Sequence, residues 1–103
     1  MGSPMKIRAT TKDGVTEVKA LMAHPMETGL RKDADGQPVP AHYISEVTAT
    51  WNDKVVMAAT WGPAVSQNPF LQIRFKGGAP GDKVTVSWKD NTGDSRSDEA
   101  VLA

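Results

Sequence analysis

The sequence predicts an all-β protein, an immunoglobulin-like β-sandwich of about seven antiparallel strands. Three observations support this prediction. Apolar and polar residues alternate in short runs, the runs are separated by Gly, Pro, Asn and Asp, and no window shows the apolar stripe of an amphipathic helix. The chain has 103 residues, which is the size of a single domain with one hydrophobic core.

The first part of the chain predicts four strands. Alternation over residues 5–9 is followed by a turn at Asp13-Gly14 and by a second run over 17–22. A third run over 42–51 meets a fourth over 55–59 through a tight turn at residues 52–53, which predicts a hairpin. In the third run, we expect one face to carry Tyr43, Ser45, Val47, Ala49 and Trp51.

The second part of the chain predicts three more strands. Alternation over 71–75 is interrupted by the glycines and proline of 77–81, resumes over 84–88, and turns again at 91–93. The last predicted strand ends at residues 101–102. Because aromatic side chains dominate core burial, we expect tryptophans in or near the core, and the chain has Trp51, Trp61 and Trp88.

Two segments do not alternate and are predicted to be long connections. Residues 24–41 contain three prolines and two glycines, and residues 62–69 form a shorter, similar segment. Loops of this length in a small domain are usually functional or mobile.

The predicted domain spans residues 5–103. Residues 1–4, which precede a second methionine, are interpreted as a remnant of expression. The sequence shows no signal peptide and no run of roughly 20 apolar residues that would span a membrane.

Composition excludes several functions. Lys and Arg together number 12 and so do Asp and Glu, which argues against a nucleic-acid binder and against a polybasic membrane patch. The chain contains no cysteine, and it therefore cannot form a disulfide, a thiolate metal site or a covalent sulfur adduct.

Catalytic and metal motifs are weak. Only two histidines exist and no serine lies in a Gly-x-Ser-x-Gly elbow, so we expect no catalytic residue. Residues 33–36 fail as a calcium loop, because an Arg and a His would occupy ligand positions, and we expect an Asx turn there instead. A copper site stays open as an alternative, and its candidate ligands are Met22, His24, Met26, His42 and Met57.

Three runs carry a family resemblance. The run His24-Pro25-Met26-Glu27-Thr28-Gly29, followed by Arg31, Asp33, Gly36 and Pro40, resembles the signature of the SoxZ family, a subunit of the SoxYZ sulfur carrier of thiosulfate oxidation. Residues 63–70 resemble the family's run around Asn-Pro, and residues 88–93 resemble its Trp-x-Asp-x-x-Gly turn.

The resemblance implies an immunoglobulin-like sandwich and a non-covalent heterodimer with SoxY. In that family the sulfur intermediates are attached to a cysteine near the SoxY C-terminus, so this chain is expected to be a non-catalytic subunit without a cofactor. It would stabilise SoxY and help to present it, through transient contacts, to other Sox enzymes. The resemblance also implies a periplasmic location reached by co-export with the signal-bearing partner.

The long connection is the candidate docking surface. Arg31 and Lys32 are candidates to attract acidic partner surfaces or the anionic cargo, whereas His24 and Met26 are expected to hold the shape of the loop. Asn68 before Pro69 is expected to form a turn. The full set of candidate interface residues is His24, Pro25, Met26, Glu27, Thr28, Gly29, Arg31, Lys32, Asp33, Asn68 and Pro69. A copper-binding sandwich and a free-standing structural module remain the alternative functions.

Overall fold

The computed structural model describes residues 4–62 and 64–103, so residues 1–3 of the expected expression remnant, and Pro63 of the second connection, lie outside the described residues. The described residues form seven strands and no helix, and hence no helix that could span a membrane. The strands are β1 (Lys6–Lys12), β2 (Val15–Leu21), β3 (Ile44–Trp51), β4 (Lys54–Thr60), β5 (Phe70–Lys76), β6 (Lys83–Asp90) and β7 (Ser95–Val101).

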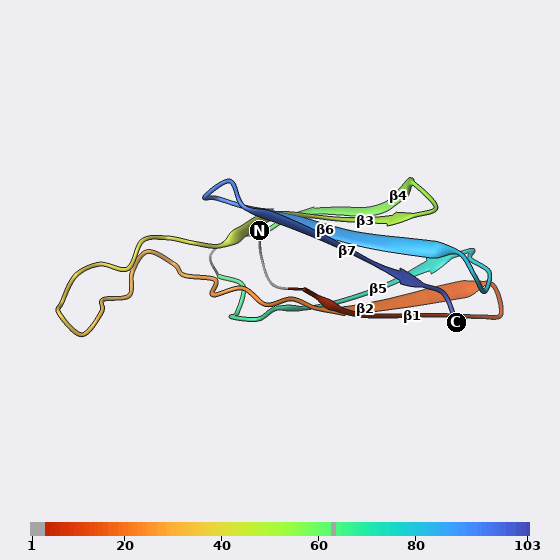
Figure 1. Cartoon of the computed structure of the whole chain (residues 1–103), viewed down its shortest axis with the longest axis horizontal. Helices are drawn as coiled ribbons and strands as arrows, with labels where there is room; N and C mark the ends of the chain where they lie inside the picture. Colours follow the sequence, from red (N-terminus) through yellow and green to blue (C-terminus); the bar gives the residue numbers. More distant parts are fainter. Residues whose placement is uncertain (1–3, 63) are drawn as a thin grey trace.

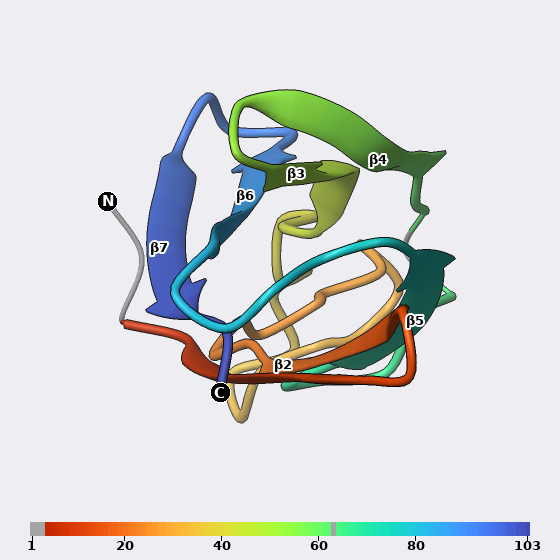
Figure 2. The same cartoon turned by 90° about the vertical axis from the view of Figure 1, so that its right-hand side faces the viewer.

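The strands form two layers, which confirms the predicted sandwich. One sheet has three strands in the order β1-β2-β5, and the other has four in the order β4-β3-β6-β7. All pairings are antiparallel. Figure 1 shows the two sheets one above the other, and Figure 2 shows the same two layers from one end.

Two of the predicted turns have the backbone that tight hairpins need. Asp13 and Gly14 both have positive φ angles, 54° and 76°, and Asn52 and Asp53 have 46° and 68°. Turns with two positive φ angles match the right-handed twist of the flanking strands, and Asn, Asp and Gly adopt them at low cost. These turns therefore set the register of β1 with β2, and that of β3 with β4 as far as the register shift between Ala49 and Thr50.

The core forms from the inward residues of both sheets. Trp88 is its largest member, while Trp51 and Trp61 are half-buried, as expected for tryptophans in or near the core. The Trp51 Nε1 proton is donated to Asp82 Oδ2 at 2.9 Å, which satisfies its polar end. The buried apolar residues are Met5, Ala9, Val18, Ala20, Met22, Met26, Ile44, Val47, Ala49, Val84, Val86, Trp88 and Leu102.

The predicted face of β3 is wrong at its beginning. Ile44 is fully buried, whereas Tyr43 and Ser45 are partly exposed. The register against β6 shifts between Ile44 and Glu46, so a β-bulge reverses the alternation there. The alternation of apolar and polar residues in the sequence does not show where such an extra residue is inserted.

The C-terminal residues close one side of the sandwich. Ala103 N–H donates to the Ala9 carbonyl, and Thr11 N–H donates to the Ala103 carbonyl, both at 3.2 Å. Met5 N–H donates to Asp98 Oδ2 at 3.0 Å, which also links β1 to β7. The two sheets are therefore joined along this side by hydrogen bonds as well as by the core.

The turn before β6 gives a test of the packing. Gly78 has φ +97°, and a Cβ there would collide with the buried Thr16 hydroxyl; Gly81 has a similar φ of +94° but open space around it. We expect Gly78→Ala to destabilise the fold by about 2–4 kcal/mol, and Gly81→Ala by about 1–2 kcal/mol from backbone strain alone. Urea unfolding measures both values, and equal losses would contradict the close contact with Thr16.

Candidate functional site

The long connection between β2 and β3 forms a protruding arm (residues 25–41, between His24 and His42), which extends away from the sandwich in Figure 1. Its two sides are joined by backbone hydrogen bonds. Glu27 and His42 exchange a pair of them at 2.7 and 3.0 Å, and Val39 N–H donates to the Arg31 carbonyl at 2.8 Å. As predicted, the segment forms no regular strand. Its two sides nevertheless run next to each other, as in a hairpin.

The tip of the arm is an Asx turn, as expected from residues 33–36. Asp33 Oδ1 accepts the backbone N–H groups of Asp35 and Gln37 at 2.9 and 3.0 Å. Gly36 has φ +77°, and its N–H donates to the Asp33 carbonyl. The side chain of Asp33 thus shapes the turn.

The charged residues of the arm differ in whether their side chains are paired within the protein. The Arg31 guanidinium holds the Glu27 carboxylate through bonds of 2.7–3.1 Å, and this pairing lowers the pKa of Glu27. Lys32 has no side-chain partner among the described residues. Leu30 beside it is 88% exposed, and its N–H donates to Thr28 Oγ1. The side chains of Leu30 and Lys32 are therefore available to contact a partner, whereas the Arg31 side chain is held by Glu27 within the arm.

Gly29 lets the two sides of the arm approach closely. Its φ is +86°, and a Cβ at this position would lie 3.2 Å from the Cβ of Ala41. A side chain here would both strain the backbone and push the sides apart. Pro25, in contrast, is exposed.

The root of the arm is tied to the second connection. The backbone N–H of His24 donates to Asn68 Oδ1 at 3.1 Å, and the His24 carbonyl accepts the Asn68 N–H at 2.9 Å. Asn68 has φ +50°, and the carbonyl of the buried Pro69 accepts the Met22 N–H. Asn68 is the turn former that its position before proline predicted, and it also fixes His24.

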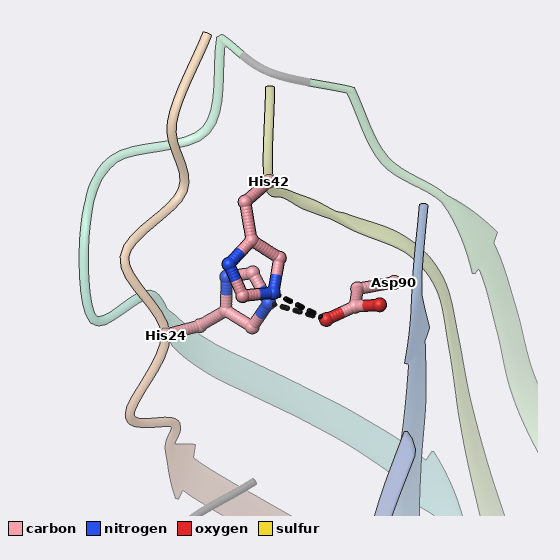
Figure 3. A group of neighbouring side chains, drawn as sticks. All are labelled: His24, His42 and Asp90. Atoms are coloured by element: carbon pink, nitrogen blue, oxygen red, sulfur yellow. Dashed lines mark hydrogen bonds and ion pairs between the residues drawn. The ribbon is translucent and has the colours of Figure 1, made fainter. Parts of the chain in front are cut away.

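Beside this contact, His24, His42 and Asp90 meet in a cluster. Figure 3 shows both imidazole rings directed at one carboxylate oxygen: His24 Nε2 lies 3.0 Å and His42 Nε2 lies 2.7 Å from Asp90 Oδ2. His24 and Asp90 are buried, at 4% and 6% exposure, and the His24 ring also packs edge-on against Trp88. The side chain of His42 is 37% exposed.

The hydrogen bonds assign the proton of His24. Its Nδ1 accepts the backbone N–H of Met26 at 3.1 Å, so Nδ1 carries a lone pair and the ring proton is on Nε2, facing Asp90. Met26 has φ +49° and is buried, and its sulfur accepts the Ile44 N–H at 3.3 Å. His24 and Met26 thus hold the shape of the root, as the sequence led us to expect.

The second oxygen of Asp90 organises the turn between β6 and β7. Asp90 Oδ1 accepts the Thr92 N–H at 2.9 Å, the Thr92 hydroxyl at 2.7 Å and the Asp94 N–H at 2.9 Å. Burial alone would raise the pKa of Asp90, but the bonds from Thr92, His24, His42 and Asp94 outweigh it and hold the pKa well below its usual range. Asp90 is therefore an ionised group that connects three segments.

The geometry favours a hydrogen-bonded structural cluster over a metal centre or a catalytic triad. The three ligand atoms lie within 4.8 Å of one another, which a metal ion could bridge. However, a ligating histidine normally donates its second ring N–H, whereas His24 Nδ1 accepts one. Among the described residues, no serine or threonine hydroxyl is hydrogen-bonded to either ring, as a nucleophilic triad requires.

The methionines of the copper alternative are dispersed. Met22 is a fully buried core residue, and Met57 packs against the same core. Met26 uses its sulfur as a hydrogen-bond acceptor. These positions are explained by packing, since Met fills irregular space in cores.

Sequence reasoning found part of this site. It assigned structural roles to His24, Met26 and Asn68, and the structure brings them together at the root of the arm. It kept His42 open as a copper ligand but gave it no structural role, and it missed Asp90 as the centre of the cluster. The available signal was the Trp-x-Asp-x-x-Gly run, in which Asp90 precedes a turn.

The fold and the site define a small immunoglobulin-like sandwich with a braced arm and without a thiol that could hold a covalent sulfur adduct. The family model of the sulphur oxidation protein SoxZ matches residues 5–101. The chain therefore belongs to the SoxZ family and has a role in the Sox system of sulfur oxidation. A search of curated proteins returned no match.

Replacement of Asp90 tests the cluster. In Asp90→Asn, the amide NH₂ group must face one of the groups that now donate to the carboxylate, so two donors oppose each other. We therefore expect a loss of about 2–4 kcal/mol in the free energy of unfolding at pH 7. The exposed arm residue Asp35 provides the matched control, and Asp35→Asn is expected to change stability by less than about 0.5 kcal/mol.

The pH dependence of the same pair of proteins supplies a second readout. Because the pKa of folded Asp90 lies below the unfolded value of about 3.9, the carboxylate stabilises fully above about pH 5, and this contribution is lost as the pH falls below about 4. The difference between wild type and Asp90→Asn should therefore narrow in acid. A difference that stays constant from pH 7 to pH 3 would show that the charge of Asp90 is not what stabilises the root.

A metal titration separates the hydrogen-bonded cluster from a metal centre. After treatment with a chelator, calorimetric titration with Zn²⁺ and, under reducing conditions, Cu⁺ is expected to show no stoichiometric uptake at micromolar concentration near pH 7. Stoichiometric uptake that His24→Gln abolishes would contradict the proton assignment at His24.

Proposed function

We propose that this chain is the non-catalytic SoxZ-type subunit of a SoxYZ sulfur carrier. It forms a non-covalent heterodimer with a SoxY-like subunit, whose C-terminal cysteine carries the covalent sulfur intermediates. The observation that carries this proposal is the SoxZ family match over residues 5–101 of a chain without cysteine. A persulfide or thiosulfonate link requires a thiolate, so the covalent chemistry must belong to the partner.

The second part of the proposal concerns the arm, which presents the carrier to the enzymes that process its cargo. Two features support this role. Its backbone is braced by hydrogen bonds, which lowers the entropy lost on docking, and its exposed Leu30 and Lys32 provide an apolar contact beside a charge. Arg31, which the sequence suggested for the same role, is held by Glu27 and is assigned to the stability of the arm.

We place the heterodimer in the periplasm, reached by co-export with the signal-bearing partner. This location follows from the family alone. It is compatible with the absence of cysteine, since the chain requires neither an oxidising nor a reducing compartment to fold.

The direct experiment is size-exclusion chromatography with light scattering on this chain, alone and mixed with the SoxY of the same genome. A one-to-one complex that survives dilution into the nanomolar range is expected. Separate elution of the two proteins at micromolar concentration would contradict the subunit assignment.

A variant of the arm sharpens the same experiment. Leu30→Ser combined with Lys32→Gln should leave the SoxY complex intact and the free energy of unfolding within about 0.5 kcal/mol of wild type, because both residues are exposed. It should weaken binding of the complex to its processing enzymes. Loss of the SoxY complex itself would assign the arm to the subunit interface instead.

A further inference from the structure

The outer face of the three-stranded sheet concentrates positive charge. Strands β1, β2 and β5 contain half of the chain's 12 basic residues but one of its 12 acids, Glu17. The strand register places all of these residues on the same face, because directly paired residues share a face and every one of the six cations is exposed. We name this the basic face, and its cations are Lys6, Arg8, Lys12, Lys19, Arg74 and Lys76.

Internal pairing neutralises only a part of this charge. Glu17 accepts a bond from Arg74 at 2.8 Å and lies 3.5 Å from Lys19. The other four cations have no side-chain partner among the described residues. The net charge of the chain is zero, so the rest of the molecule is correspondingly acidic and the charge is segregated rather than mixed.

One pair on this face opposes stability. Arg8 and Lys19 are direct neighbours across β1 and β2, and like charges in this position destabilise a sheet. Lysine and arginine on edge strands commonly prevent unwanted strand pairing, which would explain those on β1 and β5. It does not explain Lys19, because β2 is the central strand of its sheet.

The basic face also includes exposed apolar side chains that a protein partner could contact. An open hollow of about 340 Å³ is lined by Lys6, Ile7, Arg8, Lys19, Leu21 and Phe70. Leu21 and Phe70 are paired across β2 and β5 and are 42% and 57% exposed, so two large apolar groups lie next to the cations. Apolar anchors next to charge are typical of protein-binding surfaces.

We propose that the basic face docks an acidic protein surface, namely that of an enzyme that acts on the carrier, through a transient, salt-dependent contact. This inference rests on the proposed function for the identity of the partner. Permanent subunit interfaces are depleted of charge at their core, whereas complementary charge chiefly accelerates encounter. Six cations in one sheet face therefore fit a transient partner better than the permanent SoxY contact.

The test measures association rates of the SoxYZ heterodimer with each sulfur-processing enzyme of the same genome at low and high salt. The variant Lys6→Gln/Arg8→Gln/Lys12→Gln removes three exposed cations of β1. The matched control Lys54→Gln/Lys83→Gln/Lys89→Gln removes three exposed lysines from the other sheet. For at least one enzyme, the first variant should lower the association rate at low salt about tenfold and flatten its salt dependence, with less than about a twofold change in the control.

Three results would overturn the proposal: equal effects of the two variants, no effect of either, or tighter binding of heparin or phosphatidylglycerol vesicles than of any enzyme. Phe70→Ala should raise the dissociation rate of the same enzyme, and an unchanged rate would remove Phe70 and its hollow from the contact. Light scattering in the same samples reports the SoxY complex independently. If that complex fails to form, the proposed function fails, and the same association measurement, repeated with this chain alone in place of the heterodimer, still decides whether the basic face binds an acidic enzyme.

Discussion

A buried carboxylate needs hydrogen-bond donors, and the donors to Asp90 come from segments that are distant in the sequence. Its two oxygens accept from His24, His42, Thr92 and Asp94, which belong to the segment after β2, the return of the arm and the turn between β6 and β7. Leaving any of these bonds unmade costs more than forming it gains, because the group is removed from water. The path of the arm at its root follows from this requirement, since both ends of the arm must deliver a ring nitrogen to one oxygen.

The hydrogen bonds that fix the root of the arm also reduce the entropy that the arm would lose on binding a partner. An arm of 17 residues without regular strands would ordinarily lose much conformational entropy on binding. Here the bonds of Glu27 with His42, the Asx turn at Asp33 and the Arg31–Glu27 pair remove much of that freedom beforehand. The arm and the basic face lie on different parts of one sandwich, whose chain has no cysteine thiol. In the proposed function both serve recognition, and the covalent sulfur chemistry belongs to the partner.

The strands were predictable because their signal is local. Alternation and turn residues identified all seven, and the errors arose where a tertiary pairing altered the pattern, as at the bulge after Ile44. The role of Asn68 was predictable from its position before proline, and those of His24 and Met26 from their place in a long loop. Asp90 was not, because its partners His24 and His42 are 66 and 48 residues away and depend on β3 pairing with β6. The Glu27–Arg31 pair was missed because a charged loop residue has no local signal for an internal partner.

The central claim is that a neutral His24, protonated on Nε2, donates to an ionised Asp90 and thereby fixes the root of the arm. A long-range ¹H–¹⁵N correlation spectrum of the histidine rings at pH 7 tests it directly, since it distinguishes protonated from unprotonated ring nitrogens. The structure predicts a protonated Nε2 and an unprotonated Nδ1 for His24, with the Nε2 proton protected from exchange by burial. A His24 ring protonated on Nδ1 would contradict the account, because the Met26 N–H would lose its acceptor and Nε2 would be free to bind a metal.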